Sequence, residues 1–488
     1  MPDPCDEAFA DSFVQLLDKS RRDLNNFFNR FPMNHQPNHP SPAPVATLPH
    51  GFNNAFRFSA FNALSFQIVL ASPMILYAKS LGASATVLGI IAGMMPLLVI
   101  FQIPAASHIN RIGYRRFVLA GWSTRVAFIF LMALVPLAGA FLNQSNRLAL
   151  LLALLFCFNL ARGISSCAWL PWITLLVPAE LRGKYLARDA AVQNLASFGT
   201  FLLSAATLAG TTQPWQFAVL FAFSAAMGAV SLLFLKKIPD VPTPRETSPS
   251  TASVPWLEMA RYAPFAKLLR TVVVWSVAYG GITAFTVAFL KTHSGLSEGK
   301  ILLISSTAFL GGVSTLWLMH SRFDRVGSKP VLGAACGGWL IVLTGWVLLA
   351  GGVVEASLGL IVGLQFFMGL LAALANMANN RLAMAIVPPM GRNHFFAIYS
   401  VVTNVTLGLA PIAWGVLIDA IGNRAPQWLG LEWNRFTVFF AAVAVVFALT
   451  FLVSRRLDEP KAASLEELLR EILIQSPQKF WLRFWPRG

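Results

Sequence analysis

Long apolar segments alternate with short polar stretches along most of the chain. A helix needs about 20 apolar residues to cross the hydrocarbon core of a bilayer. By this measure the pattern predicts twelve membrane-spanning helices, six on each side of a polar, proline-rich stretch at Lys236–Arg261. The predicted spans of the first half are Ala55–Ala78, Ala85–Ser107, Phe117–Phe141, Leu148–Trp172, Asp189–Gly210 and Trp215–Leu235. Those of the second half are Thr271–Leu290, Ile301–His320, Val331–Ala350, Leu358–Asn379, Phe395–Asp419 and Phe436–Val453.

The second half of the chain repeats the first half in the same order. The residues that recur 210 positions later are Val177, Pro178, Arg182, Ala187, Val192 and Asn194. Parallel repeats of this kind build solute transporters with a central site. The sequence therefore predicts an all-α membrane protein made of two six-helix bundles, at 52–236 and 269–456, with a linker at 237–268 between them.

The two ends of the chain, 1–51 and 457–488, are predicted to be amphipathic. Phe9, Phe13 and Leu16 recur at helical spacing among charged residues, and Lys479–Trp485 mixes aromatic with basic residues. Segments of this composition lie on lipid headgroups or bind a partner. Both interpretations stay open at this point.

The composition excludes an ordinary soluble protein. Hydrophobic residues make up 56% of the chain and charged residues 12%, whereas a soluble domain carries about a quarter charged residues. The formal net charge of +16 is scattered over short loops, which favours retention of Lys and Arg on the cytoplasmic side over binding to nucleic acid. The distribution of Lys and Arg predicts that both termini and the linker are cytoplasmic, in an inner or plasma membrane.

The loop after the second predicted helix, Ala106–Arg116, has a counterpart after the eighth, His320–Lys329. Both resemble the G-x-x-x-D-R-x-G-R-R loop of the major facilitator superfamily, although both lack the leading glycine and the first has asparagine at the acidic position. The resemblance extends over Phe52–Arg456 and implies two bundles that rock around a site near the membrane midplane. It also implies that the loops latch one conformation. The loop positions concerned are Asn110, Arg111, Gly113, Arg115, Arg116, Asp324, Arg325, Gly327 and Lys329.

Ionisable side chains inside a membrane usually mark a functional pathway. No carboxylate lies in the middle of a predicted span, since Asp189 and Asp419 fall near helix ends, whereas Arg125 and Arg162 lie inside spans and Arg381 lies at the end of the tenth. For Arg162, deep in the fourth helix, two interpretations stay open. It is a ligand anchor or gate residue, or a structural residue bonded to helix-end carbonyls or to Asp189. We expect Arg125 to be structural, because the third helix resembles a peripheral one, and Arg381 to cap the tenth helix.

Uncharged polar and aromatic side chains on the helices that the resemblance places around the central cavity complete the candidate binding site. Buried amides need partners, which a substrate or a neighbouring helix can supply. Glycine and proline are also expected to interrupt three spans, at Gly89–Pro96, Gly280–Gly281 and Gly408–Gly415. The candidate binding residues besides Arg162 are Asn62, Gln67, Asn159, Trp169, Gln193, Asn194, Trp275, Tyr279, Gln365, Asn376, Asn379, Tyr399 and Asn404.

These features predict a secondary transporter that moves a small organic solute by alternating access. The deep arginine favours an anionic or carboxylated solute, with a sugar, a nucleoside or a drug-like compound as the alternative. The rival from another class is a transport-inactive relative that serves as a receptor or assembly factor. An enzyme is not expected, because the chain shows no nucleophile–base pair, metal-ligand cluster or phosphate-binding loop. We also expect a monomer without a cofactor or a metal.

Overall fold

The computed structural model describes residues 52–178, 181–241, 256–319, 327–387 and 392–457, all of which belong to one compact unit, Leu48–Gly488. The amphipathic terminal segments predicted at 1–51 and 457–488 lie outside these residues except for Leu457. Residues 242–255 of the predicted linker, together with Asp324 and Arg325 of the second loop, also lie outside them.

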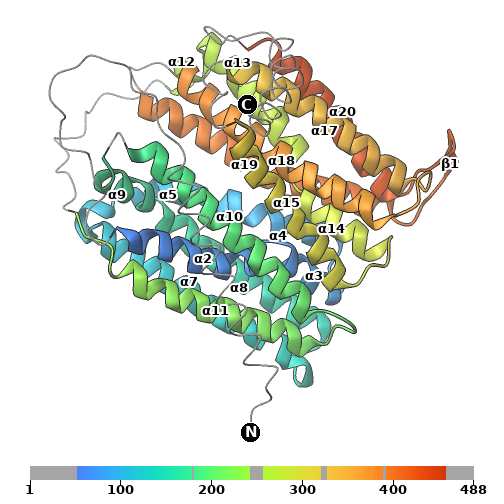
Figure 1. Ribbon diagram of the computed structural model, residues 1–488, viewed down its shortest axis with the longest axis horizontal. Coiled ribbons are helices and arrows are strands. Elements are labelled where there is room, and N and C mark those ends of the chain that lie inside the picture. The colour runs from blue at the N-terminus through green and yellow to red at the C-terminus, as the bar shows by residue number, and fades with distance from the viewer. Residues whose placement is uncertain (1–51, 179–180, 242–255, 320–326, 388–391, 458–488) are drawn as a thin grey trace, which may run out of the picture. The chain divides into compact units, whose positions relative to one another are not determined.

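The first half of the chain forms the helices coloured blue to green in Figure 1. Several predicted spans consist of two or three consecutive helical pieces. The elements are α2 (Asn53–Leu70), α3 (Ser72–Ser80), α4 (Ala85–Leu97), η1 (Leu98–Phe101), α5 (Gln102–Ala106), α6 (Ile109–Ile112), α7 (Tyr114–Leu134), η2 (Pro136–Ala140), α8 (Gln144–Ser166), α9 (Trp169–Leu176), α10 (Arg182–Thr207) and α11 (Pro214–Leu235).

The second half forms the helices coloured yellow to red. A short antiparallel hairpin separates its last two helices. The elements are α12 (Trp256–Arg261), α13 (Ala263–Tyr279), α14 (Ile282–Thr292), α15 (Glu298–Met319), α17 (Ser328–Ala350), α18 (Leu358–Ile386), α19 (Arg392–Ile421), β1 (Gln427–Trp428), β2 (Leu431–Glu432) and α20 (Arg435–Ser454).

Ten of the described helical spans are long and apolar enough to cross a membrane. The fifth and eighth predicted spans correspond to α10 and α15, which have 26 and 22 residues. At 1.5 Å per residue each of these two helices is also long enough for a bilayer. Large apolar side chains such as Phe130, Ile341 and Val445 are 58%, 77% and 69% exposed, as expected for helices that face lipid. The helical membrane fold is confirmed, and the prediction of twelve spans is consistent with it.

The first helix of each half is broken at an equivalent position. The break between α2 and α3 falls at Ala71, and the break between α13 and α14 falls at Gly280 and Gly281. The sequence predicted the second break from Gly280 and Gly281. In the structure Gly281 adopts a left-handed φ of 82°, which glycine accommodates without strain. The break at Ala71 was not predicted, although proline follows within the first turn of α3.

Of the other two predicted helix interruptions, the one at Pro96 is found and the one in α19 is wrong. The helix α4 runs through Gly89 and Gly93 and changes to a 3-10 helix only at Leu98, directly after Pro96. The helix α19 continues from Arg392 to Ile421 although it contains Pro411. A proline removes one backbone hydrogen bond, and neighbouring helices in a membrane can compensate for that loss.

The two halves pack against each other mainly through three pairs of helices: α4 with α19, α10 with α15, and α3 with α14 (Figure 1). The ends of these helices near Ser80, Ala85, Thr207 and Asp419 lie at the same end of the molecule. We call this the outer end, because the distribution of Lys and Arg predicts that it faces away from the cytoplasm. The opposite end, near Arg115 and Lys236, is called the inner end.

One asparagine fixes the start of α20. Asn434 Oδ1 accepts hydrogen bonds from the backbone N–H groups of Phe436 and Thr437 at 3.0 and 3.1 Å, and Asn434 Nδ2 donates to the carbonyl oxygen of Ala350 at 2.7 Å. We expect Asn434→Ala to lower the free energy of unfolding by about 2 kcal/mol, because the cap and a buried hydrogen bond are lost together. Thermal unfolding of the purified protein measures the change.

The matched control for this prediction is Asn143→Ala at the start of α8. Asn143 is exposed and accepts a single bond from the backbone N–H of Asn146 at 2.8 Å. Its removal should cost about 0.5–1 kcal/mol. Equal losses in the two variants would contradict the role assigned to Asn434.

Candidate functional site

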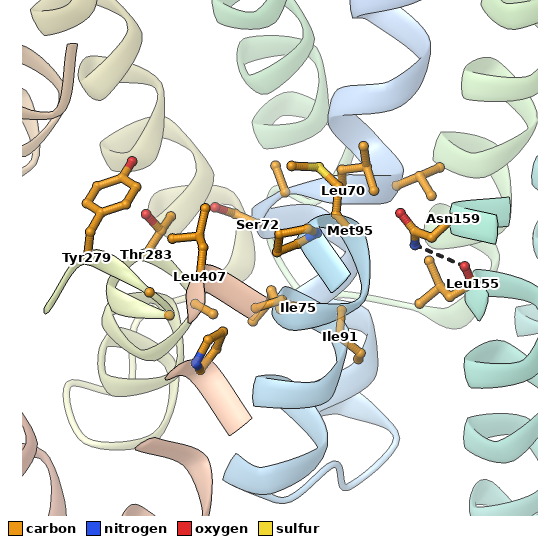
Figure 2. A pocket seen from close by; sticks show the side chains of 18 residues that line it. Leu70, Ser72, Ile75, Ile91, Met95, Leu155, Asn159, Tyr279, Thr283 and Leu407 are labelled. Carbon is orange, nitrogen blue, oxygen red and sulfur yellow. Dashed lines mark hydrogen bonds between the residues drawn. The ribbon is translucent and has the colours of Figure 1, made fainter. Parts of the chain in front are cut away.

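A cavity of about 180 Å³ lies where the two helix breaks meet (Figure 2). The first half contributes the α2–α3 break together with α4 and α8, and the second half contributes the α13–α14 break and α19. The α3–α14 pair extends from this cavity to the outer end. The cavity is therefore built by both halves and lies on the inner side of the α3–α14 contact.

The lining of the cavity is mostly apolar, and none of the described residues that line it carries a charge at neutral pH. Its polar side chains are Ser72, Asn159, Tyr279 and Thr283. Figure 2 shows Tyr279 and Thr283 on one side of the cavity and Asn159 on the other. The two halves thus face each other across the cavity with hydrogen-bonding groups on both sides.

Asn159 is the buried polar group of this site. Its side chain is 2% exposed, and its Nδ2 donates to the carbonyl oxygen of Leu155 at 2.9 Å (Figure 2). Its Oδ1 accepts no hydrogen bond from any residue that the structure describes. A buried carbonyl oxygen without a partner costs free energy, so Asn159 has an acceptor available for a ligand that donates a hydrogen bond.

Tyr279 is positioned by aromatic packing. Its ring stacks on Trp275 with the ring centroids 5.5 Å apart and meets the ring of Trp339 edge-on at 6.1 Å. Trp275 in turn packs edge-on against Phe447 of α20. Tyr279 is therefore held by three helices of the second half while its edge faces the cavity.

The helix breaks also give the cavity a favourable potential for negative charge. The helix α3 begins at Ser72 and α14 begins at Ile282, and both starts adjoin the cavity. The first N–H groups of a helix have no partner within it and carry the positive end of the helix dipole. Two such ends therefore favour a ligand with a partial or full negative charge on this side.

Arg162 lies one helical turn from Asn159 toward the inner end. Leu155, Asn159 and Arg162 are spaced by four and three residues, so they share one face of α8. The side chain of Arg162 is half-buried, and within the described ranges it has neither a hydrogen bond nor an ion pair. The predicted structural pairing with Asp189 is not found, because the Oδ2 of Asp189 accepts a hydrogen bond from Gln193 Nε2 at 2.7 Å.

Arg125 of α7 is even more deeply buried, at 5% exposed. Its guanidinium lies over the rings of Trp122 and Phe158, 4.5 and 5.2 Å from their centroids, and its Nε has no acceptor among the described residues. Cation–π contacts contribute about 0.5–2 kcal/mol each, whereas burying an ion costs several kcal/mol even after relaxation. The two rings therefore offset only part of the cost, and a purely structural role leaves the charge of Arg125 uncompensated.

Several other candidate residues are used in helix packing. Asn62 accepts a hydrogen bond from Trp122 Nε1 at 3.2 Å, and Gln67 donates to Ser197 of α10 at 2.8 Å. Asn194 and Asn404 each donate to the backbone carbonyl four residues earlier. Trp169 packs in an aromatic cluster with Phe58, Trp122 and Trp172. The structure does not bring these residues to the cavity at the helix breaks.

The candidates on α18 and at the inner part of α19 lie elsewhere in the second half. Gln365 and Asn379 are 2% and 6% exposed, and each has a side-chain oxygen without a partner in the described part of the chain. Asn376 is exposed, and Tyr399 is half-buried. Of the predicted binding residues, only Asn159 and Tyr279 line the cavity.

Other cavity-lining residues were missed because they are apolar or lie at the unpredicted break. Met95 and Leu407 line the cavity as ordinary apolar residues of α4 and α19, and Ser72 lies at the break that Ala71 begins. The only signal in the sequence was Pro73, which disfavours a continuous helix at that position.

The two loops of the sequence repeat use their cations in the same way. Gly113 and Gly327 both have a φ of 86° and precede the third helix of their half. Arg115 donates to the carbonyl oxygen of Lys236, directly after α11, and Lys329 Nζ donates to that of Leu457, shortly after α20, at 2.8 Å. Each cation therefore binds the end of the sixth helix in its own half. Arg111 and Arg116 are exposed, and the side chain of Asn110 is not among the described ones.

At the outer end, polar contacts join the two halves. Asp419, near the end of α19, accepts hydrogen bonds from the N–H groups of Ala85 and Thr86 at 3.0 and 2.8 Å and from the Thr86 hydroxyl at 2.7 Å. Thr212 donates to Glu298 at 2.9 Å, and Lys291 forms an ion pair with the same carboxylate at 2.6 Å. The bonds of Asp419 and of Thr212 join the halves on the outer side of the cavity, whereas Lys291 and Glu298 both belong to the second half.

Comparison with known proteins identifies the fold. The family model described as Major Facilitator Superfamily matches residues 56–323 and 301–486. A comparison with curated proteins finds no match.

Solved structures with the same fold include a mutant of the nucleoside transporter NupG, a D-xylose-proton symporter, and the xylose transporter XylE from E. coli in an inward open conformation. The NupG structure is 10% identical, with a TM-score of 0.66, and covers 84% of this chain and 100% of that one. The symporter is 12% identical, with a TM-score of 0.64, and covers 84% and 98%. XylE is 14% identical, with a TM-score of 0.62, and covers 86% and 99%. Because the family model covers most of the chain and the fold agrees, the protein belongs to the major facilitator superfamily.

Proposed function

We propose that the protein is a secondary transporter that moves a small organic solute across a cell membrane by alternating access. The observation that carries this proposal is the cavity at the two helix breaks, to which both halves contribute. A solute bound there contacts both halves at once, so its binding free energy can favour movement between them.

The arrangement of contacts supports an inward-facing state. The hydrogen bonds of Asp419 and Glu298 join the halves at the outer end, beyond the cavity. With both termini and the linker in the cytoplasm, as Lys and Arg predict, this state would bind or release solute on the cytoplasmic side. The inner or plasma membrane is the proposed location.

The class of solute has three candidates in the proposal. The positive ends of α3 and α14 and the unpaired Arg162 favour an anionic or carboxylated solute. The uncharged lining with Asn159 and Tyr279 suits a neutral sugar or nucleoside, and the structures of similar fold include transporters of xylose and of nucleosides. A drug-like compound is the third candidate.

Solute exchange into proteoliposomes tests the proposal, with radiolabelled benzoate, xylose and uridine as probes of the three chemical classes anion, sugar and nucleoside. We expect saturable exchange of at least one probe above that of empty liposomes. Asn159→Ala should raise the KM for that probe about tenfold, because a hydrogen bond in a buried site is lost.

The matched control is Asn146→Ala, an exposed asparagine of the same helix. It should leave the KM unchanged. Transport of none of the three probes would count against the proposal. Equal KM values for wild type and Asn159→Ala would exclude the cavity at the helix breaks as the binding site.

A further inference from the structure

We propose that Arg125 and Arg162 together form a binding site for the carboxylate of a small organic anion. This inference rests on the proposed transport function and names the chemistry of its substrate. It assigns a ligand role to Arg125, for which the sequence predicted a structural one, and treats the two cations as one site.

The two arginines come from adjacent helices and approach each other. Arg125 of α7 lies over Phe158 of α8, and Arg162 follows Phe158 by one turn on the same helix. The helices are in close contact here, because a side chain at Gly121 of α7 would collide with Ser165 of α8. Two guanidinium groups thus lie close together within the first half.

The protein supplies no negative charge to this pair in the part that the structure describes. The sequence of residues 52–241 contains thirteen Lys and Arg against three Asp and Glu. Of these three acids, Asp189 accepts a hydrogen bond from Gln193 and forms no ion pair with either arginine among the described residues, Asp240 is exposed at the end of the first half, and Glu180 lies outside the described residues. Buried charges are normally paired with an opposite charge. Two buried cations without such a partner therefore indicate that a ligand supplies the negative charge.

The surroundings indicate what the rest of that ligand is. Arg162 shares its helix face with Leu155 and Asn159, and both of those residues line the apolar cavity. An anion whose charged end binds the arginines would therefore direct its remaining atoms along α8 toward apolar surface. Guanidinium groups bind a carboxylate in a bidentate manner. A monocarboxylate with an apolar body can contact both the guanidinium groups and the apolar surface along α8. A fully hydrated inorganic anion can contact only the guanidinium groups.

The test measures binding of benzoate and of its uncharged isostere benzamide to the purified full-length protein, by the concentration dependence of the thermal unfolding temperature. We expect benzoate to stabilise the wild-type protein and benzamide to stabilise it little. Arg125→Gln and Arg162→Gln should each weaken benzoate binding by about 30-fold or more. Arg162→Lys should weaken it less, because the charge is kept and only the bidentate geometry is lost.

The control variant is Arg57→Gln, which removes one positive charge from an exposed position at the start of α2. It should bind benzoate as the wild type does. If Arg125→Gln does not fold, the half-exposed Arg162 variants carry the test. The proposal is overturned if benzoate and benzamide stabilise equally, if no stabilisation by benzoate is found, or if chloride or inorganic phosphate stabilises as well as benzoate and displaces it.

The measurements distinguish failure of the proposed anion site from failure of the proposed transport function. If benzoate binds as expected but proteoliposomes exchange none of the probes, the transport function is wrong and the anion site stands. If xylose or uridine is exchanged equally by wild type and Arg162→Gln and benzoate does not bind, the transport function stands and the anion site is wrong.

Discussion

Asp419→Ala is expected to shift the protein about tenfold toward a conformation that is open at the outer end. Three hydrogen bonds from the other half converge on this one carboxylate. The residue is exposed, so solvent reduces the strength of each bond. A combined loss of about 1.4 kcal/mol corresponds to a tenfold change in equilibrium. The alanine variant keeps the fold of each half, because the lost bonds run between the halves.

The distance between spin labels at Ser80 and Thr292 measures this shift. Both residues are exposed and end the paired helices α3 and α14. The native cysteines are first replaced, since Cys157, Cys167 and Cys336 are free thiols. A second, longer distance should gain population in Asp419→Ala. The control Asp240→Ala removes an exposed carboxylate that, among the described residues, accepts a hydrogen bond from the adjacent N–H group of Val241, and should leave the distribution unchanged. An unchanged distribution in Asp419→Ala would refute the role of Asp419 as a latch.

Gly93→Ala is expected to separate α4 from α19 and to destabilise the state that is closed at the outer end. A Cβ atom at Gly93 would collide with the carbonyl oxygen of Gly408, which belongs to the backbone of α19. A backbone atom cannot move aside as a flexible side chain can, so the helices themselves must shift. Overpacking of this kind costs about 1–3 kcal/mol, which corresponds to a shift of about 5- to 150-fold between the two states.

The accessibility of the cavity from outside measures the effect of Gly93→Ala. Ser72 is 2% exposed and lines the cavity, so Ser72→Cys reports whether a membrane-impermeant maleimide can reach it in intact cells. Labelling should be slow in the parent protein and faster with Gly93→Ala. Gly199→Ala is the matched control, because nothing lies within 4 Å of a Cβ at that helical glycine. Identical labelling rates in all three proteins would show that the α4–α19 contact does not close the cavity.

The sequence was sufficient to predict the helices and their repetition, because each span is a long apolar run and length alone decides whether it can cross a bilayer. It also predicted the break at Gly280 and Gly281, where the backbone conformation requires glycine. It did not predict that α19 passes Pro411 without a break. That outcome depends on packing against α4, which no local pattern records.

The candidate binding site was only partly predictable for a related reason. Asn159 and Tyr279, both among the candidates, line the cavity at the helix breaks. Gln67 was a candidate on the same grounds, but its amide donates a hydrogen bond to Ser197, 130 residues away in the sequence. Which amide finds a partner depends on how each helix is rotated about its axis. Arg125 illustrates a further limit, since its sequence position does not indicate that it is 5% exposed with an Nε that has no acceptor among the described residues.

The bonds of Arg115 and Lys329 have a mechanical consequence. Each hydrogen bond links the start of the third helix to the residues that follow the sixth helix of the same half. It therefore holds these two helices together at the inner rim of each bundle. A rocking motion can then leave both rims intact and break only the bonds at the interface. The resistance to that motion is concentrated in a few separable contacts, so its rate can be tuned by single substitutions without loosening either bundle.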